Sequence, residues 1–402
     1  MKKRYTGSDE PKKIWNTICK HEKKRGGIYL PISFGGKEFV FYSYEKLISD
    51  SRAAALLLLE MTSPYDPITI AADAYDTMMI LLACSLISRS VIISDERDSM
   101  TFRGLIITDK KSYSPKFISP EELHTLIAGT LSGNPSSDIQ CTREEIEITF
   151  RSKGENVTYS ESSALLSAIA FKTGCALSSH DRLISLFSPS LENGFLCGIL
   201  SPLISGASLA VCSQPESIIR QIKALSPTKL FCERKVASAL ILKLLKIKKL
   251  HPRSPKAKIS LSIDPSVIWL NRLTHPRISY LLGGKLKTVI SLGELSPISA
   301  KAFFSFGIYS ISIRSVKGIT PTLFHYGEDK KGKWKLPVGA SADICNVQTG
   351  GLGNIVISSP YVREGHHTPN TYLPYEKASP SSLVTPLCGF VAKKGGVFIL
   401  GE

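Results

Sequence analysis

The sequence lacks the short motifs that most directly identify a metal centre or a hydrolase. It has no C-x-x-C pair and no Cys/His spacing suited to zinc, although cysteine occurs nine times. It also lacks G-x-S-x-G, the Walker-type G-x-x-x-x-G-K-[ST] and H-E-x-x-H. The run Gly350–Gly353 is better explained as a hairpin turn, and adjacent His366 and His367 on a strand would point to opposite faces. These absences argue against a zinc domain, a disulfide framework and the common hydrolases.

Acidic residues are in short supply. Only 34 Asp and Glu oppose 50 Lys and Arg, which gives a formal net charge of +16. Such an excess attracts nucleic acid, anionic lipid or phosphorylated ligands without choosing among them. The basic residues cluster at Lys2–Arg4, Lys20–Arg25 and Lys243–Lys258, and such clusters are usually solvated faces.

The third basic cluster adjoins an apolar stripe. The stripe consists of Leu242, Leu244, Leu245, Ile247 and Leu250. We interpret it as a helix with one face in the core and one wet basic face. Peripheral contact with an anionic membrane is the alternative, and nucleic acid is the less favoured partner.

Long uncharged runs are scarce. One segment, Gly194–Val211, has 18 residues without a charge, which is the lower limit for a membrane-spanning helix, and Pro202 and Gly206 interrupt it. A buried helix followed by a strand explains it without a membrane. The N-terminus is charged and polar through residue 27, without a signal-peptide pattern. We therefore expect no transmembrane segment and a cytoplasmic location.

Alternating helix and strand patterns are present along most of the chain. They predict a layered α/β protein with largely parallel sheets. Predicted helices cover 44–61, 73–86, 161–174, 195–203, 215–225 and 299–306. Predicted strands cover 67–71, 91–94, 146–150, 182–187, 208–211, 229–232, 287–292 and 309–313. From Trp334 onward the chain is strand-rich, with a hairpin between 342–347 and 354–358, and predicts a small β lobe.

Four ordered blocks of the sequence resemble the adenylate-forming superfamily, which includes acyl-CoA synthetases. They are GGKEFVFYSYEKLISDSRAAALLLLEM (35–61), the segment VTYSESS to ISGASLAV (157–211), LGGKLKTVISLGELSPISAKAFFSFGIYS (282–310), and LPVGASADICNV to GGVFILGE (336–402). The resemblance implies a layered αβαβα core with parallel sheets plus a small β lobe. We therefore expect two α/β subdomains, residues 1–160 and 161–330, followed by the β lobe, residues 331–402.

The positions that carry chemistry in this superfamily are altered here. Its phosphate loop is rich in small residues and ends in Lys-Gly, because backbone N–H groups must approach the phosphates. The matching segment is TFRSKGEN (149–156), in which Arg151, Ser152, Lys153 and Gly154 are the candidate contacts. The bulky Phe150 and the acidic Glu155 disfavour a triphosphate, so we interpret this segment as a polar turn.

The superfamily's adenine and magnesium motif, Tyr-Gly-x-Thr-Glu, is also replaced. By resemblance its positions fall on Arg314, Ser315, Val316, Lys317 and Gly318, downstream of the Gly-rich turn at Gly293. Glycine stands where the metal-binding carboxylate would be, and Mg²⁺ requires such hard oxygen ligands. Magnesium binding is therefore not expected.

Two further catalytic parts have no match. The ribose-binding Asp of the superfamily corresponds to Leu387, and we expect no counterpart of the small C-terminal domain that supplies a catalytic lysine. Losing one preorganised transition-state contact typically costs ~10²–10³ in rate, and here several are altered together.

We therefore predict a catalytically degenerate binding or regulatory module that retains a site for an acyl or aryl carboxylic acid or binds a protein partner. It could also retain ATP or AMP at Arg151, Ser152, Lys153, Gly154, Gly293, Arg314 and Lys317. One alternative is an acid ligase that works with a separate C-terminal domain. Another is a peripheral binder of anionic membranes or RNA.

Overall fold

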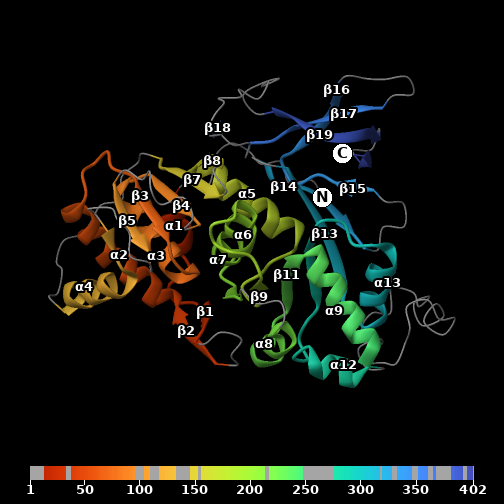
Figure 1. The fold of residues 1–402 in the computed structure, drawn as a ribbon, viewed down its shortest axis with the longest axis horizontal. Helices are drawn as coiled ribbons and strands as arrows, with labels where there is room; N and C mark the ends of the chain where they lie inside the picture. The colour runs from red at the N-terminus through yellow and green to blue at the C-terminus, as the bar shows by residue number, and fades with distance from the viewer. Residues whose placement is uncertain are drawn as a thin grey trace.

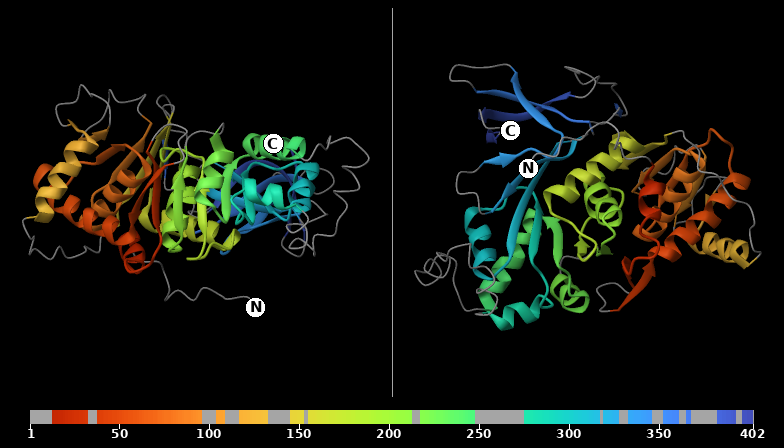
Figure 2. Two further views of the ribbon diagram at one scale, coloured as in Figure 1. Left: turned by 90° about the horizontal axis from the view of Figure 1, so that it is seen from below. Right: turned by 180° about the vertical axis from the view of Figure 1, so that it is seen from behind.

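The computed structural model describes residues 13–32, 38–95, 104–108, 117–132, 145–152, 155–212, 217–247, 275–316, 319–327, 333–345, 352–360, 365–367, 382–392 and 396–401. In these residues two β-sheets stand side by side, with helices between them and on their outer faces (Figure 1). Two further views show the orange smaller sheet at one end of the molecule and the green-to-blue part of the larger sheet at the other (Figure 2). The yellow-green helices lie between them. The predicted layered α/β class is confirmed.

The smaller sheet has the strand order β18-β8-β7-β4-β3-β5-β6. Its strands are β3 (Ile68–Ala71), β4 (Val91–Ser94), β5 (Leu105–Thr108), β6 (Phe117–Ile118), β7 (Glu147–Ser152), β8 (Glu155–Ser160) and β18 (Gly365–His367). Strands β3 to β7 pair in parallel, whereas β8 and β18 are antiparallel additions at one edge. Strand β18 therefore connects the C-terminal lobe to this sheet.

The larger sheet has the order β16-β17-β19-β20-β15-β14-β13-β12-β11-β9-β10-β1-β2. Its central strands, which pair in parallel, are β1 (Gly27–Pro31), β9 (Arg182–Ser185), β10 (Ser208–Val211), β11 (Lys229–Glu233), β12 (Thr288–Leu292) and β13 (Tyr309–Val316). The antiparallel strands are β2 (Phe39–Ser43), β14 (Ile319–Tyr326), β15 (Trp334–Lys335), β16 (Ser341–Cys345), β17 (Gly353–Ser358), β19 (Ser382–Ala392) and β20 (Gly396–Gly401). The predicted hairpin between β16 and β17 is confirmed by the pairing of Ala342 with Ile357.

The helices follow from local signals in the sequence. Helix α2 begins after Ser43, whose hydroxyl accepts a hydrogen bond from the Lys46 amide, and α3 begins after Asp73, which caps it in the same way. The helices are α1 (Ile14–Cys19), α2 (Tyr44–Met61), α3 (Ala74–Ile87), α4 (Pro120–Ser132), α5 (Glu161–Gly174), α6 (Glu192–Phe195), α7 (Ser201–Ile204), α8 (Ile218–Leu225), α9 (Arg234–Ile247), α12 (Pro276–Leu281) and α13 (Pro297–Ser305). The bounds predicted for α2 and α5 are confirmed.

Alternate residues of the larger sheet face two different cores. Phe231 and Ile290 point to the side where α5 packs, together with Phe171 of that helix. Leu230 and Val289, one residue earlier on the same strands, belong to the core under α8, α9, α12 and α13. A strand covered on both faces reads as a continuous apolar run, which is why β11 and β12 were recognisable from sequence.

One predicted helix, 195–203, differs in the structure. It is divided into α6, the π-helix η2 (Leu196–Leu200) and α7. Ser201 donates its N–H to the Leu196 carbonyl, five residues back, and Pro202 has no N–H with which to continue an α-helical ladder. Among the helices described above, none has the length and hydropathy needed to span a bilayer.

The apolar stripe predicted beside the third basic cluster is only partly correct. Leu244 and Leu245 are buried, but Leu242 and Ile247 are exposed. The buried face of α9 instead includes Ala237, Leu240 and Ile241. A spacing of three and four residues places these side chains on one face of the helix. The lysines in the C-terminal half of α9 made this apolar spacing hard to recognise from the sequence. Residues 248–258 of the cluster, including Leu250, lie outside the described residues, as do Lys2–Arg4, Gly350 and Gly351.

Candidate functional site

The carboxyl ends of β9, β11, β12 and β13 meet at one edge of the larger sheet. In open α/β sheets, ligands bind at this edge, especially where successive strands send their helices to opposite faces. Strand β9 leads to α6, which packs on the face of the larger sheet that is turned toward the smaller sheet (the inner face). Strand β11 leads to α9, which packs on the opposite, outer face. The edge therefore meets the topological requirement for a binding crevice.

Gly293 forms the turn that follows β12. Its φ of +93° lies in the left-handed region that favours glycine, and its N–H donates a 2.8 Å hydrogen bond to the Ile313 carbonyl. The Ser291 hydroxyl donates to the Gly293 carbonyl at 3.0 Å. The N–H thus holds the turn against β13, and the carbonyl is bound by the preceding strand, β12.

Arg314 lies near the end of β13, one residue beyond the partner of Leu292. Its guanidinium is 3.7 Å from a carboxylate oxygen of Glu294 and lies over the ring of Trp334 at 5.4 Å. The structure thus brings Arg314 close to the Gly293 turn. Because the guanidinium is paired with the adjacent carboxylate, the site does not favour a cation at Glu294.

Arg151 and Ser152 lie in the other sheet, at the end of β7. The Arg151 Nε donates to the Asn156 side chain at 2.9 Å, across the β7–β8 hairpin. The Ser152 hydroxyl donates to the Asp95 carboxylate, also at 2.9 Å. A carboxylate at this hairpin would repel a phosphate. Lys153, Gly154 and Lys317 lie outside the described residues.

An aromatic cluster lies next to this edge, on the face of the larger sheet against which α5 packs. The rings of Phe187 and Phe231 are 4.5 Å apart, and Phe171 lies 5.2 Å from Phe231. Cys197 of the π-helix packs in the same core, and burial raises the pKa of its thiol well above the usual range. This thiol is therefore protonated and unreactive at neutral pH. Sequence patterns did not indicate that these aromatic residues meet here.

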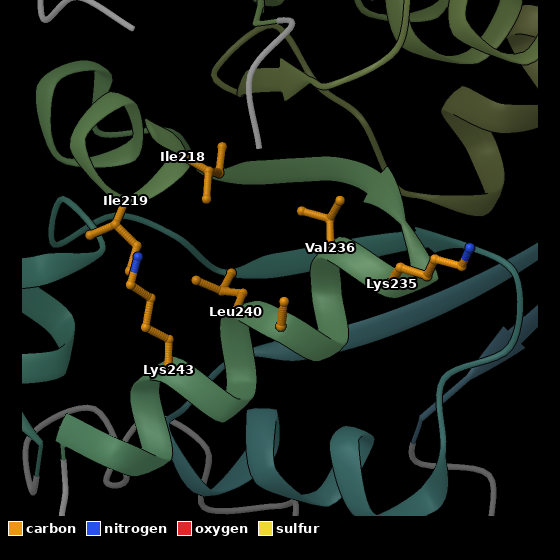
Figure 3. A pocket seen from close by; sticks show the side chains of 7 residues that line it. Ile218, Ile219, Lys235, Val236, Leu240 and Lys243 are labelled. Carbon is orange, nitrogen blue, oxygen red and sulfur yellow. The ribbon is translucent and has the colours of Figure 1, made fainter. Parts of the chain in front are cut away.

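A pocket of about 380 Å³ lies between α8 and α9 on the outer face (Figure 3). Its lining consists of Ile218, Ile219, Lys235, Val236, Ala239, Leu240 and Lys243. The lining is apolar except for two lysines, which lie two helical turns apart at opposite ends. Because α8 and α9 follow β10 and β11, the pocket extends outward from the same carboxyl edge. Its size falls within the roughly 300–1,000 Å³ that small-molecule sites occupy.

Several solved structures match this chain over nearly its whole length. No family model and no curated protein matches the chain. VinN in complex with L-aspartate matches with a TM-score of 0.74 at 12% identity, over 96% of this chain and 98% of that one. The anthranilate CoA ligase AuaEII, in complex with anthranoyl-AMP, matches with a TM-score of 0.70 at 12% identity, over 99% of this chain and 78% of the ligase. The N-terminal domain of FACL13 from Mycobacterium tuberculosis matches at 0.69 and 10% identity, over 97% and 100%.

The chain has the fold of the N-terminal domain of adenylate-forming enzymes. Within this adenylation fold, the position that resembles the ribose-binding Asp is Leu387, which is 2% exposed in the core of the β lobe. Its side chain belongs to the same buried apolar cluster as Ile355 and Val397. Among the residues that the structure describes, no three His, Cys, Asp or Glu side chains are grouped to hold a metal ion.

Proposed function

We propose that this chain is a binding module built on an adenylation fold, which holds an amphiphilic carboxylic acid between α8 and α9 and does not activate it efficiently. The pocket of about 380 Å³ is the observation that supports the proposal. Its isoleucine, valine and leucine side chains suit an alkyl chain, and a lysine at each end suits a carboxylate. VinN binds L-aspartate and AuaEII binds anthranoyl-AMP, so this fold accommodates an amino acid and an acyl-adenylate elsewhere.

The nucleotide positions support a degenerate module. The pairing of Arg314 with Glu294 and the bond from Ser152 to Asp95 use side chains at the positions that resemble the adenine and phosphate contacts. ATP or AMP could still bind weakly near Gly293, where a guanidinium is present. Efficient transfer of an adenylyl group to a carboxylate also requires oriented charge stabilisation, and the sequence has Gly318 where the superfamily has its metal-binding carboxylate.

Decanoate binding measured by calorimetry tests the proposal. Ala239→Trp should weaken decanoate binding at least tenfold, because the exposed Ala239 lines the pocket and an indole would fill it. Leu242→Trp is the matched control, since Leu242 is exposed on α9 and does not line the pocket. Lys243→Gln should weaken decanoate but leave 1-decanol unchanged, because only the acid carries a charge.

Two results would contradict the proposal. Equal decanoate affinity of Ala239→Trp and the unaltered protein would remove the pocket as the site. Robust ATP-dependent pyrophosphate exchange with decanoate would instead favour an active ligase, in which case the degenerate interpretation is wrong. Both measurements use the same protein preparation.

A further inference from the structure

A group of basic side chains gathers where the turn after α1 meets α5 and α7, on the opposite side of the larger sheet from α8 and α9. Lys20, His21 and Lys24 come from the turn, and Lys172 comes from the last turn of α5. The Lys24 ammonium and the His21 Nδ1 lie 2.9 and 3.0 Å from the point that a Cβ atom at Gly206 would take. They therefore share one small space above this glycine.

The charges of this group are not compensated. The one acidic residue of the turn is Glu22, and its carboxylate oxygen lies 3.8 Å from the guanidinium of Arg52. In the described chain, no carboxylate lies within ion-pair distance of Lys24 or Lys172. Surface lysines are usually free to extend into water, but Lys172 is half-buried and next to another cation.

The His21 ring is fixed in the same space. Its Nε2 donates a 3.0 Å hydrogen bond to the Ile204 carbonyl, at the end of α7. Its Nδ1 is buried and has no hydrogen-bond partner within the described ranges. Because Nε2 carries the proton, Nδ1 is a buried acceptor without a donor, and such an unsatisfied group is costly. A bound group that presents an O–H beside the Lys24 ammonium would satisfy it.

The cations disfavour one another. Burial, and then the charge of Lys24, lower the pKa of Lys172. Burial is also the main cause of the lowered pKa of His21, with Lys24, Lys172 and Lys20 adding to it. Lys20 and Lys24 are exposed to solvent and Lys172 is half-buried, so a bound anion would offset a repulsion that acts mainly on Lys172.

We propose that His21, Lys24 and Lys172 form a binding site for a phosphate group, separate from the pocket between α8 and α9. A phosphate dianion neutralises two ammonium groups, whereas a carboxylate neutralises one. Lysine binds phosphate as a point charge and does not require the planar geometry that arginine imposes. Because Gly206 has no Cβ, the Lys24 ammonium and the His21 Nδ1 can lie 2.9 and 3.0 Å from the point that a Cβ would take, and Lys172 adds a second positive charge nearby.

Titration of the intact protein with pyrophosphate and inorganic phosphate, at constant ionic strength in chloride, tests this site. We expect saturable binding by calorimetry that weakens at least tenfold in Lys24→Gln/Lys172→Gln. The matched control, Lys285→Gln/Lys301→Gln, removes the same charge from exposed positions and should bind like the unaltered protein. Vesicles of phosphatidate in phosphatidylcholine form a second arm, and loss of vesicle binding in the same variant would identify a lipid headgroup as the source.

A stability measurement separates a binding role from a structural one. Without phosphate, Lys24→Gln/Lys172→Gln should melt at or above the temperature of the unaltered protein, because the repulsion is removed. A clear fall in melting temperature would show that the lysines support the fold, which would overturn the proposal. Binding of neither phosphate nor vesicles, or binding unaffected by the substitution, would overturn it as well.

Discussion

Buried carboxylates in the N-terminal layer each have a defined donor. Asp50 is 2% exposed and accepts a 2.7 Å hydrogen bond from the Tyr75 hydroxyl, while the Lys46 ammonium lies 2.9 Å away. Asp76 is bound by the His124 Nε2 at 2.7 Å. An ionised carboxylate without such partners would be costly to bury. The contact between Asp76 and His124 also attaches α4 to α3.

The pair of His124 and Asp76 predicts a pH-dependent stability. The hydrogen bond with Asp76 raises the pKa of His124, burial opposes this, and Asp50 and Asp73 reinforce it. A histidine whose pKa is raised on folding stabilises the fold fully below its ordinary value of 6.5, and this contribution is lost as pH rises through the raised value. His124→Asn should therefore lower the melting temperature most at pH ~5.5 and progressively less toward pH ~9.

Calorimetry across this pH range, with His180→Asn as control, checks the prediction. His180 is exposed in the turn before β9, so its substitution should change the melting temperature little at any pH. A difference between His124→Asn and the unaltered protein that does not vary with pH would contradict a charged pair.

At the scale of elements, one buried glutamate joins three helices. Glu161, in the first turn of α5, accepts a 2.8 Å hydrogen bond from the Ile14 amide of α1 and another from the Ser85 hydroxyl of α3. The Lys13 ammonium donates to the Ser85 carbonyl at 3.0 Å. Burial raises the pKa of Glu161, although these hydrogen bonds oppose the shift. Burial thus disfavours the charged form of Glu161, whereas the surrounding donors favour it.

The junction at Glu161 separates the effect of charge from that of hydrogen bonding. Glu161→Gln keeps an oxygen acceptor, so its free energy of unfolding should stay near that of the unaltered protein. Glu161→Ala leaves the buried Ile14 amide without its acceptor, which should cost about 1–3 kcal/mol. Glu45→Ala, at the exposed first turn of α2, is the control in denaturant titrations. Equal losses for Gln and Ala at 161 would contradict this account.

Sequence patterns predicted elements better than contacts between elements. The bounds of α2 and α5 follow from local periodicity and capping. Helix α4 was not predicted, although Ser119 and Glu122, which form reciprocal hydrogen bonds at its start, are a capping-box pattern in the sequence. The altered motif residues were also visible in the sequence. The pairing of Arg314 with Glu294 and the pocket between α8 and α9 were not, because each joins segments separated along the chain.

The whole molecule is held together across the two sheets. Strands β1 and β2 belong to the larger sheet, whereas the segment that follows them forms the smaller one. Strand β18 returns from the C-terminal lobe to pair with β8. The core of the smaller sheet includes side chains from beyond residue 160, such as Leu165, Phe195 and Leu200.

This arrangement predicts that a fragment ending at residue 160 does not fold alone. Fully burying one leucine or phenylalanine side chain contributes ~1.5–3 kcal/mol, and the fragment loses Leu165, Ala168, Phe195, Ile199, Leu200 and Leu203 from its core. Several such losses exceed much of the ~5–15 kcal/mol that keeps a typical domain folded. The fragment should show no cooperative thermal transition and little near-ultraviolet circular dichroism. A fragment extended to residue 212 restores these side chains together with β9 and β10, so it should recover both signals if this shared core is the cause. A sharp transition in the shorter fragment would show instead that the smaller sheet is self-sufficient.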